Sequence, residues 1–131
     1  MAATDVKDDR KYTKDHEWAL DKQGELVVGI TAFAVDQLGD VTLVNIDVKA
    51  GEVVTAGKAF GTIESVKTLS DLFCPVSGKV VAVNAVLEEK PEVVNEDCWN
   101  EGWMIVIAPT GATENLMDAG AYAAFLKESA H

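Results

Sequence analysis

Short β-prone runs separated by turn residues recur through most of this 131-residue chain. Val, Ile and Leu alternate with polar residues in several of these runs, which is typical of half-buried strands. Gly, Pro, Asn and Asp stand between the runs, where they favour turns. The pattern therefore predicts a mainly β fold. We expect strands at residues 18–20, 26–30, 41–48, 52–54, 58–65, 69–74, 79–83 and 103–108.

One short helix is expected to interrupt the strands. Thr31 is a suitable N-cap for a helix that runs through Leu38, because its hydroxyl can accept a hydrogen bond from the first turn. Gly39 follows at the position where a left-handed C-terminal cap falls. Residues 87–95 have Pro91 in their middle, so they predict one helical turn or a loop.

The two ends of the chain differ in pattern. Residues 1–10 are acidic and poorly patterned, and we expect them to be frayed. At the other end Thr113 can cap a helix over residues 114–119, and residues 121–128 continue a helical composition beyond Gly120. The length is that of one domain, so we expect a single unit over residues 1–131 with a helical C-terminus at 113–128.

Net charge and composition limit the classes of partner. The formal charge is −11 and the isoelectric point is near 4.4. Such a surface repels phosphate backbones and anionic lipids, which argues against nucleic-acid and membrane partners. It suits transient docking onto basic patches of other proteins. Residues 1–14 lack the pattern of a targeting signal, so we expect a cytoplasmic bacterial protein, or a mitochondrial matrix protein if the chain is a processed eukaryotic one.

The chain is poor in residues for catalysis of its own. His16, beside Glu17, is a candidate general base, although an isolated histidine is more often a structural group, and His131 is at the terminus. Cys74 and Cys98 lack the C-x-x-C spacing of zinc and dithiol sites, so we expect buried, reduced thiols and no metal site. No Gly-rich phosphate loop and no H-E-x-x-H motif is present.

Lys67 is expected at the tip of a tight hairpin, between the predicted strands at 58–65 and 69–74. Rigid strands hold such a lysine away from the core, so its ammonium group is open to other proteins. A lysine in an arbitrary turn is more often a solvated surface residue without a specific role. The spacing alone does not decide between these two interpretations of Lys67.

Six short motifs follow one another in order along residues 12–126. They are Y-T-K-D-H-E-W from Tyr12, G-I-T-A-F-A-V-D-Q-L-G-D from Gly29, E-S-V-K-T-L-S-D around Lys67, C-P-V-S-G from Cys74, P-E-V-V-N-E-D from Pro91 and E-G-W-M from Glu101. In this order and spacing they resemble the H protein family of the glycine cleavage system. The chain departs from the usual family pattern at residues 44–47, V-N-I-D, and at residues 98–99.

The resemblance implies a lipoyl-domain-like fold, a flattened barrel or sandwich of two small antiparallel sheets with a short inserted helix and a helical C-terminus. Lys67 would be acylated by lipoate, which removes its charge and makes a long arm. The protein would then be a carrier and not an enzyme. Its implied partners are a lipoate-attaching enzyme, the pyridoxal-phosphate glycine decarboxylase, the tetrahydrofolate-dependent aminomethyltransferase and the FAD enzyme dihydrolipoamide dehydrogenase.

The same resemblance implies roles for acidic residues. The aminomethyl group that such an arm carries is labile in water and its amine is cationic, so carboxylates should line a shelter for it. The matching positions are Glu17 and Asp71, with Asp15 a neighbour. Glu64 and Asp71 also flank the lysine turn, where the lipoate-attaching enzyme could recognise them. In a chain this acidic, the alternative is that these acids are solvated surface.

Other functions remain open from the sequence. The protein could instead relay lipoate to other dehydrogenase complexes. A small hydrolase using His16 with Glu17 or Asp71 is a candidate of a different class. A biotin carrier is disfavoured, because S-V-K-T lacks methionine on both sides of the lysine. We expect a monomer, since one arm must reach several enzymes.

Overall fold

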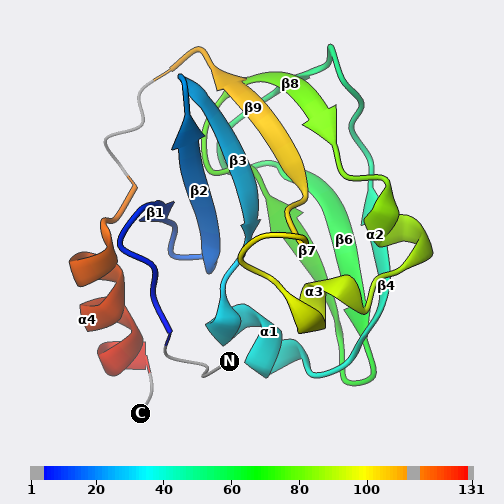
Figure 1. The fold of residues 1–131 in the computed structure, drawn as a ribbon, viewed down its shortest axis with the longest axis vertical. Coiled ribbons are helices and arrows are strands. Elements are labelled where there is room, and N and C mark those ends of the chain that lie inside the picture. The colour runs from blue at the N-terminus through cyan, green and yellow to red at the C-terminus, as the bar shows by residue number, and fades with distance from the viewer. Residues whose placement is uncertain (1–4, 112–115, 130–131) are drawn as a thin grey trace.

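Two antiparallel sheets form the fold of the computed structural model, which describes residues 5–111 and 116–129 (Figure 1). Side chains of both sheets meet in one hydrophobic core, among them Val28, Ile105 and Ile107 from the larger sheet and Ile63 and Leu72 from the smaller one. The larger sheet has the order β1 (Lys11–Tyr12), β2 (Glu17–Lys22), β3 (Glu25–Ile30), β9 (Ile105–Pro109), β8 (Gly78–Val83) and β5 (Val53–Val54).

The smaller sheet has three strands in the order β4 (Val41–Ile46), β6 (Ala59–Ser65) and β7 (Leu69–Phe73). Both sheets keep open edges, with β7 and β4 at the edges of the smaller one. The prediction of a mainly β fold with two antiparallel sheets is therefore confirmed, in the form of an open sandwich and not a closed barrel.

The turn residues between β2 and β3 explain why the sequence predicted a hairpin here. Gln23 and Gly24 both have positive φ, 57° and 91°, as a two-residue hairpin turn requires. The Gly24 amide donates to the Asp21 carboxylate at 2.9 Å and closes the turn. The predicted strands are present here and extend further toward the turn than expected.

Helix α1 (Ala32–Leu38) begins as predicted, with the Thr31 hydroxyl accepting from the Ala34 amide at 3.3 Å. Gly39 ends the helix at the predicted position but in a different conformation, with φ 75° and ψ −148°. The reason is that the chain leaves the helix directly into the extended strand β4, so it needs an extended ψ that the left-handed helical region does not supply.

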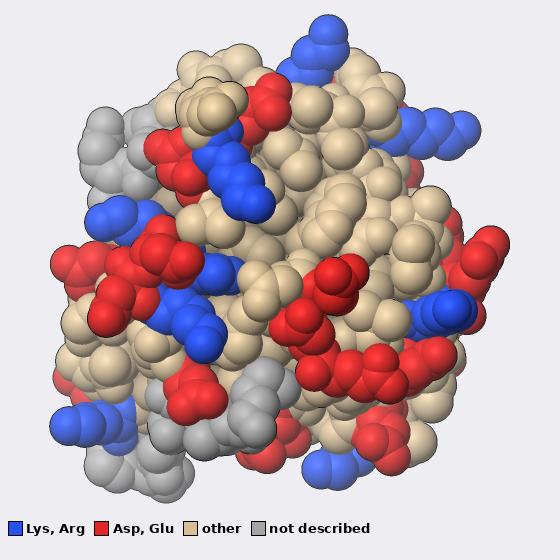
Figure 2. All heavy atoms as spheres, viewed as in Figure 1, with Lys and Arg blue, Asp and Glu red and all other residues tan. Residues whose placement is uncertain are grey.

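Pro91 separates two short helices, α2 (Val86–Glu89) and α3 (Val93–Glu96), where one helical turn or a loop was expected. Acidic side chains gather on the surface around these two helices, among them Glu88, Glu89, Glu92 and Glu96 (Figure 2). This part of the surface has the character that favours docking onto basic partners.

Helix α4 (Ala119–Ser129) starts later than predicted. The expected helix over residues 114–119 is wrong for residues 116–118, and Thr113 and Glu114 lie outside the described residues. Met117 instead pairs with Tyr12 through two backbone hydrogen bonds of 2.8 Å, and the Asp118 carboxylate accepts from the Ala121 amide at 2.8 Å. No helix in the described part of the chain has the length and apolar character needed to span a bilayer.

The expectation of a frayed N-terminus through Arg10 is also wrong for the described part of that segment. Arg10 is buried, donates from Nη1 to the Trp99 carbonyl at 2.8 Å, and places its guanidinium 4.6 Å from the centre of the Trp18 ring. The Lys7 amide donates to the Tyr12 hydroxyl at 2.7 Å. Lys7 and Arg10 thus tie this segment to the folded domain, and residues 1–4 lie outside the described residues.

Candidate functional site

Lys67 lies in the turn that joins β6 to β7, at the foot of Figure 1. The Ser65 hydroxyl accepts from the amides of Lys67 and Thr68, each at 3.2 Å. The Ser65 amide donates to the Thr68 carbonyl at 2.8 Å. The predicted hairpin is confirmed, and a single serine side chain fixes the backbone that carries the exposed lysine.

The loop between α1 and β4 supports the turn that carries Lys67. The Val66 amide donates to the carbonyl of Asp40, between α1 and β4, at 3.0 Å. The Lys67 side chain lies against Gly39, where an added methyl group would be 3.3 Å from Lys67 Cε. Asn95 holds the same loop, because its Oδ1 accepts from the Val41 amide at 2.8 Å and its Nδ2 donates to the Gly39 carbonyl at 2.9 Å.

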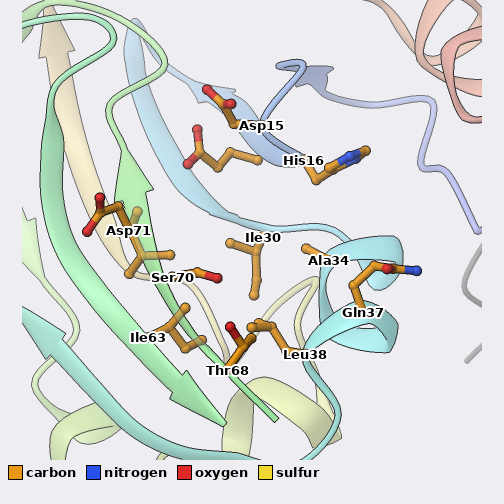
Figure 3. A pocket seen from close by; sticks show the side chains of 12 residues that line it. Asp15, His16, Ile30, Ala34, Gln37, Leu38, Ile63, Thr68, Ser70 and Asp71 are labelled. Atoms are coloured by element: carbon orange, nitrogen blue, oxygen red, sulfur yellow. The ribbon is translucent and has the colours of Figure 1, made fainter. Parts of the chain in front are cut away.

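A cleft of about 330 Å³ begins beside the turn, at Thr68. Figure 3 shows Asp15 and Asp71 at the end of the cleft opposite Thr68 and Leu38. Asp71 lies three positions after Thr68, which in a strand is roughly 10 Å. The cleft is lined by Asp15, His16, Glu17, Ile30, Ala34, Gln37, Leu38, Ile63, Thr68, Ser70, Asp71 and Leu72.

Glu17 is a buried acid in the cleft wall, only 2% exposed. One carboxylate oxygen accepts from the Phe73 amide at 2.7 Å, and the other accepts from the Thr13 hydroxyl at 3.3 Å. Since Glu17 starts β2 and Phe73 ends the edge strand β7, this contact joins the two sheets. Burial, with the nearby Asp15 charge adding to it, raises the pKa of Glu17 to about 8 despite these hydrogen bonds.

His16 takes part in a different set of contacts. Its Nδ1 lies 2.8 Å from the Tyr122 hydroxyl, which lies 2.8 Å from the Thr31 hydroxyl. The ring packs against Phe33 and Phe125, with ring centres 4.5 and 5.7 Å away, and burial lowers the pKa of the imidazole. Figure 3 shows the ring directed away from Asp15 and Asp71. The ring therefore joins the segment before β2 to α1 and α4, and does not face Asp71 as a hydrolase with that pair would need.

The remaining candidate acids divide between the rim of the cleft and the outer face of the smaller sheet. Asp15 and Asp71 are exposed at the rim of the cleft. Glu64 pairs with Leu69 across β6 and β7, whereas Ile63 pairs with Ser70 and both line the cleft. Because alternate residues of a strand point to opposite faces, Glu64 faces outward. The structure thus brings Glu17, Asp15 and Asp71 together and leaves Glu64 outside the cleft.

Cys74 and Cys98 are buried, reduced thiols, as predicted. Burial raises the pKa of Cys74 to about 11 and that of Cys98 to about 12, so both remain protonated at neutral pH.

The sequence model of the glycine cleavage H-protein family matches residues 10–129. The chain belongs to the glycine cleavage H-protein family. The resemblance in the motifs around Lys67 is therefore confirmed.

Curated members of the glycine cleavage H-protein family are similar along nearly their whole length. The glycine cleavage system H protein of Anaeromyxobacter sp. strain K is 49% identical over 126 residues, which are 95% of this chain and 98% of that protein. An H protein of Thermus thermophilus is 46% identical over 128 residues, 96% of this chain and 99% of its own. The crystal structure of an H protein from Mycobacterium marinum superposes with a TM-score of 0.86 at 38% identity, covering 93% of this chain and 99% of that one.

Two residues of this H-protein site were not found from the sequence. Gly39 was expected only as a helix cap, yet it also makes room for the Lys67 side chain. Asn95 had no expected role, although it lies in the segment P-E-V-V-N-E-D on which the resemblance partly rests. Its link to Gly39 spans 56 residues, so no local pattern points to it.

Proposed function

We propose that this protein carries lipoate as an amide on Lys67 and serves as the mobile carrier of glycine cleavage. The most direct support is the position of Lys67, which is exposed on a turn fixed by Ser65. The next residue, Thr68, lines a cleft that has carboxylates at its other end. Membership of the glycine cleavage H-protein family supports the same function. The protein itself would turn over no substrate, and its partners would act on its arm.

The residues around Lys67 fit an amide-linked arm. The lysine side chain is exposed, and glycine at position 39 leaves space for its methylenes. Acylation neutralises the ammonium group, so the turn loses one positive charge. Lipoate bound there would supply a dithiolane whose sulfur atoms carry the aminomethyl group and electrons between enzymes. Those enzymes would be glycine decarboxylase, the tetrahydrofolate-dependent aminomethyltransferase and dihydrolipoamide dehydrogenase.

The acids of the cleft would shelter the cationic amine of the cargo. Glu17 and Asp71 are the principal candidates, with Asp15 beside them at the rim. An ammonium group near Glu17 favours the ionised carboxylate and so lowers its raised pKa. Glu17 would therefore release a proton as the amine enters. The two hydrogen bonds that Glu17 accepts from Phe73 and Thr13 orient the carboxylate for this contact.

Intact-mass measurement tests the attachment site. After incubation with lipoate, ATP and a lipoate ligase, we expect the wild-type chain to gain one lipoyl group and Lys67→Arg to gain none, although it keeps the charge. Lys58→Arg is the matched control, because Lys58 is also an exposed lysine beside β6, and it should be modified normally. Full modification of Lys67→Arg would reject the assignment.

Release of formaldehyde and ammonia tests the shelter. Protein loaded with the aminomethyl group and separated from its partners should lose that group faster in Glu17→Ala than in wild type, with attachment of lipoate unchanged. Glu25→Gln removes an exposed acid outside the cleft and should decay as wild type does. Equal decay of Glu17→Ala and wild type would remove Glu17 from the shelter.

A further inference from the structure

Three of the exposed large hydrophobic side chains lie at the end of the smaller sheet that carries Lys67. Among the described residues, six such side chains are at least 40% exposed, and Leu43 at 46%, Val66 at 67% and Leu69 at 62% belong to this end. Exposed single leucines are common and need no explanation. A contiguous group beside a candidate modification site does need one, because such patches mark interaction surfaces.

Strand register joins these residues into one row. Leu43 on β4 pairs with Glu64 on β6, and Glu64 pairs with Leu69 on β7. Paired residues share a face of the sheet, and neighbouring strands are about 4.8 Å apart, so the row spans roughly 10 Å. Val44 and Ile63, the adjacent residues on the opposite face, are each 1% exposed and fill the core. The row therefore points outward, away from the cleft.

We propose that this row, Leu43, Glu64 and Leu69 together with Val66 in the turn, is the docking surface for the enzyme that attaches lipoate to Lys67. We name it the outer row. The inference rests on the proposed function, and it adds the apolar residues and the face of the sheet by which the attaching enzyme approaches. The cleft on the other face remains free for the arm after attachment.

The attaching enzyme is the occupant that the geometry favours, because it must recognise the protein before any arm exists. Its affinity must come from folded protein surface, whereas enzymes that act later also contact the arm. In the attachment step the Lys67 amine attacks the carbonyl carbon of an acyl adenylate. The amide C–N bond forms, the bond from that carbon to the phosphate oxygen breaks, AMP leaves and the amine gives up a proton.

The charge of the outer row defines the complementary surface. Glu64 lies between two leucines in the outer row, because it pairs with Leu43 on one side and with Leu69 on the other. The matching surface of the enzyme therefore carries an arginine or lysine between apolar side chains. An acid with apolar neighbours binds such a cation in a partly desolvated setting, where the contact is stronger than at an open surface.

Steady-state attachment kinetics test the proposal with purified, unmodified full-length protein as the varied substrate. Leu43→Thr/Leu69→Thr keeps β-compatible side chains and should raise KM at least about tenfold, with kcat near the wild-type value. Glu64→Gln should raise KM and weaken its dependence on salt. Val53→Thr/Val86→Thr is the matched control, because these residues are 79% and 51% exposed and lie outside the smaller sheet. It should leave KM unchanged.

A competition assay separates docking from chemistry. Lys67→Arg cannot be acylated, but with an intact outer row it should inhibit modification of wild-type protein. The same chain with Leu43→Thr/Leu69→Thr added should inhibit at least about tenfold less. Val66→Thr lies in the turn, outside both strands, and gives a second test should the double variant fail to fold by circular dichroism; it should also raise KM.

The outcomes distinguish this proposal from the proposed function. An unchanged KM and unchanged inhibition in the folded outer-row variants would overturn the docking surface while leaving Lys67 as the attachment site. A slower reoxidation by dihydrolipoamide dehydrogenase with normal attachment would overturn it in favour of that partner. Lack of any lipoyl addition to wild-type protein would instead reject the proposed function.

Discussion

Asn95 holds the backbone of Gly39 through a hydrogen bond of 2.9 Å from its Nδ2 to the Gly39 carbonyl. The same side chain accepts from the Val41 amide at 2.8 Å, and the carbonyl of Asp40 between them accepts from Val66 at 3.0 Å. One amide in α3 therefore fixes the loop on which the lysine turn rests. The support of the turn that carries Lys67 therefore depends on a residue that is distant in sequence.

Replacing Asn95 by alanine should loosen the lysine turn. The two hydrogen bonds lost leave Val41 N–H and Gly39 C=O without this partner, so we expect a loss of about 1–3 kcal/mol in the free energy of unfolding. We also expect slower lipoate attachment at equal protein concentration, measured by intact mass. Asn84→Ala is the control, because Asn84 makes a similar pair of bonds to the carbonyls of Glu101 and Trp103. It should lose stability and keep the wild-type attachment rate.

Gly39→Ala should affect both the fold and the modification. Alanine is strained at φ 75°, ψ −148°, at a cost of about 1–3 kcal/mol, and its methyl group would lie 3.3 Å from Lys67 Cε. Gly24→Ala also places alanine at positive φ, 91°, but nothing lies within 4 Å of the added methyl group. Both variants should be less stable in urea titrations, and only Gly39→Ala should slow attachment. Equal attachment rates would show that Gly39 does not position the lysine.

Arg10→Met should destabilise the N-terminal segment. The change removes a charge-assisted hydrogen bond to the Trp99 carbonyl and the stacking of the guanidinium on Trp18, which together are worth about 2–4 kcal/mol. Arg10→Lys should recover little, because a lysine lacks the planar group that stacks and donates at once. Lys11→Met is the exposed neighbour and should stay within about 0.5 kcal/mol of wild type. Tryptophan fluorescence in urea measures all three.

Local patterns made most of the strands and the Lys67 hairpin predictable. Alternating residues and turn-forming glycines act over a few positions, and the Thr31 cap acts over three. The errors came from contacts between distant segments. Arg10 is ordered by a carbonyl 89 residues away, and the start of α4 is displaced because Met117 pairs with Tyr12. The local sequence carries no sign of either contact, because both partners are distant along the chain.

In the candidate site, too, local motifs indicated some residues, whereas others depend on contacts between distant segments. Glu17, Asp71 and Lys67 were found because short motifs carried the family resemblance. The outward direction of Glu64 follows from strand alternation, which the sequence does contain, but the partners that complete the outer row depend on which strands become neighbours. The position of Asn95 against Gly39 depends on how α3 packs beside α1, and no periodicity encodes that packing.

The buried carboxyl of Glu17 should make stability fall as pH rises. Burial raises its pKa from 4.5 to about 8, so the folded protein binds this proton more tightly than the unfolded chain does. Its contribution is fully present below about pH 4.5 and is lost as pH rises toward 8, with a slope of at most roughly 1.4 kcal/mol per pH unit. Glu17→Gln keeps an oxygen acceptor for the Phe73 amide and removes the titration.

The free energy of unfolding of Glu17→Gln, relative to wild type, should therefore increase steadily between pH 5 and pH 8. Urea titrations at several pH values measure this difference directly, and subtracting wild type cancels the titration of groups common to both proteins. Glu25→Gln removes an exposed carboxyl of β3 and should give a difference that is nearly constant over the same range. A constant difference for Glu17→Gln as well would mean that Glu17 is already ionised in the folded protein. In that case its carboxylate would receive a cationic amine without releasing a proton.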